Sequence, residues 1–366
     1  MKRIGKLVLI AFAMGTLAAG NSNAGVDEVY EKTVDRLSWG QILNFFVGNE
    51  DFEKSYAFVV GISNYTHYSQ LPTENDALRM RDFLVNEAGF DYVHLLTDDK
   101  ATWGRIHELM VDDFRNRINE NDRFLFYWSG HGAQIKVGTG YEGYLPLAGS
   151  PKGKLSTMVS MSDLQRWDRL IRARQALFLL DACFSGLAGR ASKAPARELT
   201  ISQLSGPAHH LMTAGTGEEE AIAGDRWGGS LFTAAILEGL GGAADTETVF
   251  ERDGVVSLNE LIAYVKTRIA IEKSNAGWSR SITPQLRDIG STPNQGEFFF
   301  LTNEFKVRKA GGVPAQGQVV IEKGMPLVVL QHPTNKTPPS SGEQLPRSEP
   351  SSNGEETFRE WWDSRK

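Results

Sequence analysis

Short apolar runs alternate with longer amphipathic stretches through most of this chain. The apolar runs predict buried strands at residues 56–62, 93–96, 124–128, 176–180, 211–214 and 298–301. The amphipathic stretches predict helices at residues 73–88, 101–118, 160–172, 229–240 and 258–269. Continuous apolar runs are typical of parallel strands that are buried on both faces. We therefore expect a three-layer α/β/α sandwich with a mostly parallel central sheet, and an active site at the carboxyl ends of its strands.

The beginning of the chain has a different pattern. Lys2, Arg3 and Lys6 precede an apolar run at residues 7–19, and small residues follow at 22–24. This order is typical of a cleavable secretory signal peptide, and the run is short for a membrane span. We expect residues 1–24 to be removed before Gly25 and the protein to be periplasmic or secreted. An uncleaved anchor helix is the alternative.

Three further segments follow the signal peptide. Residues 25–52 form an N-terminal extension in which the apolar residues fall near helical spacing, namely Val26, Val29, Tyr30, Val34 and Leu37. Residues 53–302 contain the predicted core, and residues 303–366 form a C-terminal extension. Its stretch 331–356 is rich in Pro, Ser, Asn and Gly and is not expected to fold. The aromatic residues near its end, Phe358, Trp361 and Trp362, either are solvated or form a docking element.

Composition narrows the possible functions. The chain has 366 residues, of which 41% are hydrophobic and 23% charged, an ordinary globular balance. Its net charge of −6, without a basic run after the signal peptide, makes nucleic-acid binding a poor fit. Cys183 is the single cysteine, so an intrachain disulfide is impossible. This thiol is either buried and inert or kept for its reactivity.

Two motifs that contain candidate catalytic residues directly follow two of the predicted strands. Residues 124–128 lead into Ser129-Gly130-His131-Gly132, and residues 176–180 lead into Asp181-Ala182-Cys183. A sulfur nucleophile needs a nearby base, and His131 is the only histidine placed for that role. The backbone N–H groups of Gly132 and Cys183 are candidates for an oxyanion hole. The alternative is a buried core histidine and a buried core thiol beside turn glycines.

These motifs resemble those of a known family. SGHG followed by DACFSG resembles the HG…AC signature of caspase-like peptidases, which include caspases, metacaspases and legumains. AFVVGISNY and LPTENDA are similar to the first strand and helix of the metacaspase branch. EGYLPL, SLFTAAILEGL, DGVVSLNELIAYV, TPQ and GEFFFL are similar to later segments of bacterial members. The resemblance covers residues 53–302 and implies a cysteine endopeptidase with a Cys–His dyad, without an essential third residue.

The resemblance also implies a primary specificity pocket lined with acids, which would comprise Thr73, Asp76, Ser129 and Asp181. Ser129 and Asp181 each lie two residues before a dyad member, and alternate strand positions share a face. Asp76 has a second interpretation, because Thr73 and Asp76 have the spacing of a helix capping box. The pocket predicts cleavage after Arg or Lys. Cleavage after aspartate and a catalytically silent binding protein are the alternatives.

Two further expectations concern calcium and self-cleavage. Calcium-dependent metacaspases carry several acids after the histidine and the cysteine, whereas residues 131–149 contain only Glu142 and residues 184–197 contain none. We expect no metal and no cofactor. Asp253, Gly254 and Glu260 resemble half of an EF-hand loop, but Ser257 to Glu260 fits a capping box better. Residues 187–206 are a candidate site of self-cleavage, because the stretch contains Arg190, Lys193 and Arg197 among small residues.

Overall fold

The structure is a computed structural model that describes residues 25–32, 52–184, 190–191, 204–216, 222–245, 254–278 and 282–302. Its centre is an eight-stranded sheet with the order β1-β3-β2-β4-β8-β10-β14-β9. The strands are β1 Asp27–Glu31, β2 Ser55–Gly61, β3 Tyr92–Thr97, β4 Arg123–Ser129, β8 Gln175–Phe184, β9 Arg190–Ala191, β10 Ala208–Thr216 and β14 Gln285–Asp288. Strands β3, β2, β4, β8 and β10 are parallel, and β1 and β14 pair antiparallel with their neighbours. The predicted mostly parallel sheet is confirmed.

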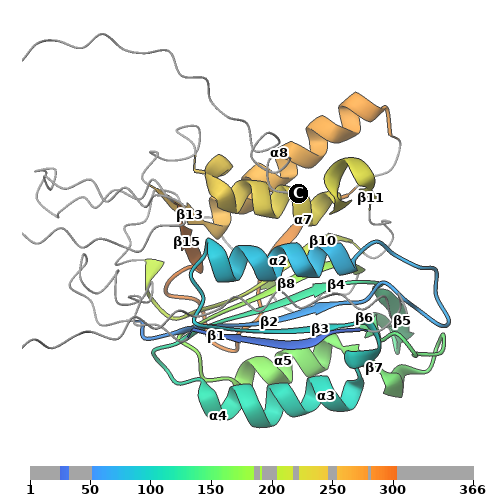
Figure 1. Cartoon of the computed structure of the whole chain (residues 1–366), viewed down its shortest axis with the longest axis horizontal. Helices are drawn as coiled ribbons and strands as arrows, with labels where there is room; N and C mark the ends of the chain where they lie inside the picture. Colours follow the sequence, from blue (N-terminus) through green and yellow to red (C-terminus); the bar gives the residue numbers. More distant parts are fainter. Residues whose placement is uncertain are drawn as a thin grey trace, which may run out of the picture.

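Helices cover both faces of this sheet (Figure 1). One layer contains α2 Glu74–Asn86, α7 Leu231–Glu238 and α8 Leu258–Ala276. The other contains α3 Trp103–Glu108, α4 Arg115–Arg117 and α5 Met161–Leu170. A wider helical turn, η2 Leu109–Phe114, joins α3 to α4, and η5 Gly239–Ala243 continues α7. The arrangement confirms the α/β/α sandwich.

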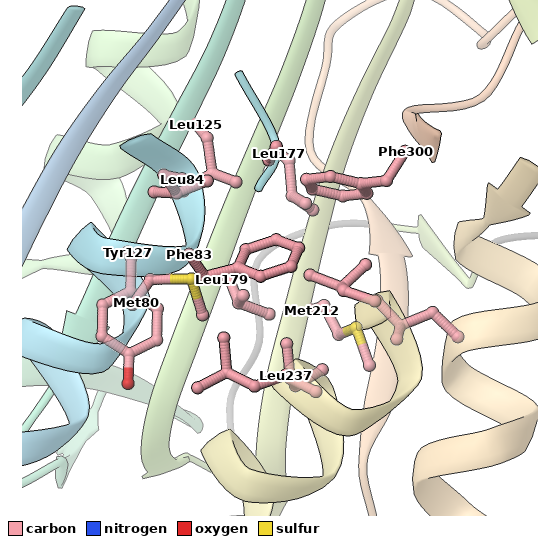
Figure 2. Packing of buried hydrophobic residues seen from close by; sticks show 14 of the residues in the cluster. Met80, Phe83, Leu84, Leu125, Tyr127, Leu177, Leu179, Met212, Leu237 and Phe300 are labelled. Carbon is pink, nitrogen blue, oxygen red and sulfur yellow. The ribbon is translucent and has the colours of Figure 1, made fainter. Parts of the chain in front are cut away.

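The continuous apolar runs are explained by two cores, one on each side of the sheet. Phe58, Phe126 and Phe178 point to one side, where their ring centroids are 5.6 and 5.8 Å apart in succession. The intervening residues of the same strands point to the other side and meet α2 and α7 (Figure 2). Each strand is therefore buried on both faces, which is why no polar alternation marks it in the sequence.

Small sheets and single turns complete the described part of the chain. Strands β5 Ala133–Val137, β6 Gly140–Pro146 and β7 Met158–Ser160 form an antiparallel sheet directly after His131. The pairs β11 Ala223–Gly224 with β12 Gly229–Ser230, and β13 Val255–Ser257 with β15 Phe299–Leu301, form two-stranded ladders. Short 3-10 turns are η1 Asp98–Lys100, η3 Leu155–Thr157 and η4 Asp225–Trp227. Of the helices in the described ranges, none has the length and apolar character needed to cross a bilayer.

One of the two predictions about the ends of the core is wrong. Residues 27–31, expected to be helical, form the edge strand β1, which pairs with β3 from Asp27↔Leu96 to Glu31↔Tyr92. Val26 and Tyr30 pack against the core, whereas Val29 is largely exposed, so the apolar residues do not share one face as the helical spacing predicts. The strand predicted at residues 298–301 is confirmed at residues 299–301, and it pairs with β13 outside the main sheet. The capping box at Ser257 is confirmed, since the Ser257 side chain accepts from the Glu260 N–H and Glu260 accepts from the Ser257 N–H.

Candidate active site

The two motif-bearing strands, β4 and β8, are neighbours in the sheet. Their parallel register places Ser129 opposite Asp181, and the Gly130 N–H donates to the Asp181 carbonyl at 3.3 Å. His131 and Cys183 each lie two residues further along, so their backbones reach the same carboxyl edge of the sheet. Strand β8 does not end at residue 180 as expected; it continues through Cys183, which pairs with Gly215 of β10 after a bulge. The Cys183 side chain lies outside the described part of the structure, so its pairing with His131 stays a prediction.

The imidazole of His131 is oriented by a backbone carbonyl. Its Nε2 lies 2.8 Å from the Ser69 carbonyl oxygen, and the Ser69 hydroxyl is more distant at 3.4 Å. A carbonyl oxygen can only accept, so Nε2 carries the proton and Nδ1 keeps its lone pair. His131 is therefore held in the tautomer in which Nδ1 can act as a base.

Two tyrosines enclose this imidazole. The ring centroids of Tyr65 and Tyr68 lie 4.7 and 5.4 Å from that of His131, and the Tyr65 hydroxyl accepts from the His131 backbone N–H at 2.9 Å. Burial lowers the pKa of His131 below its usual 6.5, with a smaller contribution from the Lys152 charge, while the Ser69 carbonyl opposes the shift. The side chain is consequently neutral at pH 7.

Asp98 supports the loop that carries these contacts. Its backbone φ is 45°, and its buried carboxylate accepts from the backbone N–H groups of Ser63 and Asn64 at 2.7 and 2.8 Å and from the Asn64 side-chain amide at 2.8 Å. Ser63 and Asn64 begin the loop that presents Tyr65, Tyr68 and Ser69 to His131. Asp98 was not among the site residues predicted from the sequence. The available signal was an aspartate two residues after a predicted strand, because aspartate tolerates positive φ.

The two predicted pocket acids, Asp76 and Asp181, lie together in the interior. Asp76 accepts from the Ser230 backbone N–H at 3.1 and 3.0 Å and from the Ser129 hydroxyl at 3.4 Å. Asp181 accepts from the Thr233 hydroxyl at 2.5 Å, and Tyr127 lies 2.6 Å from the same hydroxyl. Both carboxylates thus contact the first turn of α7, where N–H groups lack helical partners. This contribution of α7 was not predicted from the sequence.

Burial and mutual repulsion act on both acids in the same direction. Loss of hydration raises the pKa of Asp76, and the neighbouring Asp181 charge raises it further. Burial likewise raises the pKa of Asp181. The Arg79 guanidinium lies 3.6 Å from Asp76 and lowers the pKa of that carboxyl in part. Among the described residues, the Arg79 guanidinium is therefore the one cation whose charge acts on both buried carboxylates.

The approach of Asp76 to the β12 strand requires a glycine. A Cβ at Gly229 would lie 2.2 Å from an Asp76 carboxylate oxygen, and Gly229 has φ of 142°, where side chains are rarely tolerated. Arg79 donates to the Trp227 carbonyl at 2.8 Å, which holds the same segment from the other side. Helix α2 therefore fixes the segment that leads into α7.

The capping-box interpretation of Thr73 and Asp76 is wrong. Thr73 is the N-cap of α2, but its side chain makes no capping hydrogen bond. Instead its hydroxyl donates to the Ile62 carbonyl at 2.6 Å, and the Asp76 carboxylate is bound to Ser230. Thr73 is buried one helical turn before Asp76. Gly132 lies between His131 and β5, and its role in an oxyanion hole stays a prediction.

Three of the other histidines have structural contacts with aspartates. His94 lies 2.7 Å from Asp27, His209 lies 2.6 Å from Asp168, and His210 lies 3.5 Å from Asp288. These pairs tie strands β1, β10 and β14 to their surroundings. Within the ranges that the structure describes, no group of three or more His, Cys, Asp or Glu side chains is arranged to hold a metal ion.

The fold and the site together define an α/β/α protein with a histidine and a cysteine on adjacent strand ends. The caspase domain family model matches residues 54–289, and the chain therefore belongs to the caspase-domain family of cysteine-type endopeptidases. The crystal structure of caspase-1 from Spodoptera frugiperda is similar, with 13% identity and a TM-score of 0.43 over 65% of this chain and 88% of that chain. No curated protein sequence matches the chain.

Proposed function

We propose that this caspase-like peptidase cleaves peptide bonds after arginine or lysine, with Cys183 as the nucleophile and His131 as the general base. The proposed specificity rests on one observation: Asp76 on α2 and Asp181 on β8 are buried next to each other at the same edge of the sheet. His131 is neutral and its Nδ1 keeps a lone pair that can accept a proton, which supports the catalytic assignment.

The reaction follows from these roles. His131 Nδ1 takes the thiol proton while Cys183 Sγ bonds to the carbonyl carbon, and the backbone N–H groups of Gly132 and Cys183 stabilise the oxyanion. The C–N bond then breaks, and the imidazolium gives its proton to the leaving amine. Water attacks the thioester, His131 accepts a proton from that water, and Cys183 leaves with the proton returned as a thiol.

Charge explains the preference for a basic residue. When both acids are ionised, Arg79 balances only one of them, and a substrate guanidinium would supply the missing positive charge through a bidentate contact. An aspartate substrate would place a third carboxylate nearby, which costs several kcal/mol by the general estimate for like charges. At about 1.4 kcal/mol per tenfold, the discrimination is roughly a hundredfold or more.

The test compares kcat/KM for matched peptides with Arg, Lys, Asp or Ala before the scissile bond. We expect the wild type to hydrolyse the Arg and Lys peptides much faster than the Asp and Ala peptides, and Cys183→Ala and His131→Ala to hydrolyse none of them. His107→Gln is the matched histidine control, because His107 lies on α3 and stacks on Trp103. Equal hydrolysis of the Asp and Arg peptides would disprove the specificity, and full activity of Cys183→Ala would disprove the mechanism.

Rates with a chelator and with added calcium test the expected independence from calcium.

Two processing steps belong to the same proposal. We expect removal of residues 1–24 during export to the periplasm or the medium, and self-cleavage within residues 187–206. Of this second stretch, only residues 190–191 and 204–206 are among the described residues. Incubation of the purified enzyme should yield fragments that begin after Arg190, Lys193 or Arg197, whereas Cys183→Ala should stay intact. Identical fragments from both proteins would rule out self-cleavage.

A further inference from the structure

Gly25, the residue before which cleavage is expected, is held at its backbone nitrogen. The Gly25 N–H donates to the Asp99 carboxylate at 2.7 Å. The next residue, Val26, donates to the Thr97 hydroxyl at 2.7 Å and accepts from the Thr97 N–H at 2.8 Å. The chain before β1 is thus bound to the turn that follows β3.

This contact leaves no room for a side chain. A Cβ at Gly25 would lie 2.1 Å from the Thr97 carbonyl oxygen and 2.7 Å from the Asp99 carboxylate. Both distances are far below ordinary contact, and the first involves a backbone atom that cannot turn aside. Among the amino acids, only glycine brings its nitrogen this close to Asp99 without a shift of the chain.

We propose that Asp99 is the binding site for the α-ammonium group that cleavage between Ala24 and Gly25 creates. Hydrolysis of that bond by a signal-removing peptidase places a carboxylate on Ala24 and leaves the Gly25 nitrogen with three protons. The nitrogen already lies at hydrogen-bond distance from Asp99, so cleavage converts a neutral donor into a charged one in the same place. Charge-assisted hydrogen bonds of this type are stronger than neutral ones.

The surrounding charges suit a terminal ammonium. Lys100 lies 3.5 Å from the second carboxylate oxygen of Asp99, which leaves the first oxygen for Gly25. Further along β1, Asp27 contacts Arg105 at 2.9 Å, and Glu28 contacts Arg81 at 2.7 Å. The docked terminus would be the first of a row of ion pairs that fasten β1 to the edge of the sheet.

The position of this site is relevant to the peptidase. Thr97 ends β3 at the carboxyl edge of the sheet, and Asp98, next to Asp99, holds the loop around His131. The proposal rests on the proposed removal of residues 1–24, but not on peptidase activity. Its test can therefore fail or succeed separately from that of the catalytic mechanism.

The experiment compares two proteins, one beginning at Gly25 and one extended by residues 21–24, each with Asp99 and with Asp99→Asn. Asp99 is largely exposed, so the expected effect is modest. The protein that begins at Gly25 should melt about 1–3 °C higher at low salt, and the gap should close in Asp99→Asn and in 1 M salt. Its α-amine should also be acylated more slowly at pH 7 than that of the Asp99→Asn form.

Asp112→Asn is the matched control, because Asp112 is an exposed acid on the helical segment that follows α3. This variant should retain the full difference between the two proteins. A gap of equal size in Asp99→Asn, or no gap in the wild type, would overturn the proposal. N-terminal sequencing of protein secreted with residues 1–24 provides a second test, since a mature terminus other than Gly25 would overturn it as well.

Discussion

His131 and the Asp76–Asp181 pair border the same sheet edge, but their neighbours differ in kind. His131 is surrounded by two tyrosine rings and a carbonyl oxygen, whereas the acids are surrounded by hydroxyl and N–H donors and one guanidinium. Burial favours the neutral form in both places, so it lowers the pKa of the histidine and raises those of the acids. The neutral histidine can therefore accept a proton. The acids favour their protonated form, and a bound cation would favour loss of those protons.

The largest expected effect comes from the acids. Asp181→Asn should lower kcat/KM for arginine peptides about a hundredfold, because it removes one of the two acids that we propose bind the substrate guanidinium. Hydrolysis of a matched alanine peptide should change little. Asn keeps a carbonyl oxygen that can accept from Thr233, so α7 should stay folded.

The control for that variant is Asp168→Asn, which alters a buried aspartate that contacts His209 instead. It should leave the preference for arginine intact. If Asp181→Asn lowers hydrolysis of the alanine and arginine peptides equally, Asp181 supports α7 and does not select substrate.

The second effect is on stability and follows from the raised pKa of Asp76, about 8. The folded state binds this proton more tightly than the unfolded state, whose carboxyl has a pKa near 3.8. The free energy of unfolding should therefore fall as the pH rises from about 4 to about 8. Asp76→Asn removes this contribution. The fall in the free energy of unfolding across that pH range should therefore be smaller in Asp76→Asn than in the wild type, by roughly 1–3 kcal/mol. Urea titrations at pH 5 and pH 8.5 measure the difference, and parallel curves for both proteins would contradict it.

The adjacency of the two strands that lead to His131 and Cys183 could be predicted, because each motif follows a continuous apolar run and parallel strands bring their carboxyl ends to one edge. The role of α7 could not be predicted. Thr233 and Ser230 are 52 and 154 residues from the acids they contact, and only the packed sheet brings them together. The strand β1 was missed for a related reason, since an exposed edge strand has one buried neighbour and a weak apolar pattern.

The third effect concerns the loop around His131. Asp98→Ala removes three hydrogen-bond acceptor contacts and places alanine at φ of 45°, so we expect about a tenfold lower kcat for every peptide, with KM nearly unchanged. Asp98→Asn tolerates that backbone conformation and keeps one carbonyl oxygen, so its loss should be smaller. A change in the preference between peptides, in place of a uniform loss, would show that Asp98 acts on the acid pair as well.

The smallest effect separates the two tyrosines. Tyr65→Phe removes the hydroxyl that accepts from the His131 N–H but keeps the ring, and the loss of a neutral hydrogen bond predicts about a threefold lower kcat without a change in pH dependence. Tyr68→Ala uncovers the imidazole, so the pKa of His131 should rise toward 6.5 and the acid limb of kcat/KM should move to higher pH. Lys152, which lies 5.5 Å from the Tyr68 ring, opposes protonation of His131 in both variants and does not account for a difference between them. If the pH profile moves in Tyr65→Phe and not in Tyr68→Ala, the hydroxyl of Tyr65, and not burial by the Tyr68 ring, sets the pKa of His131.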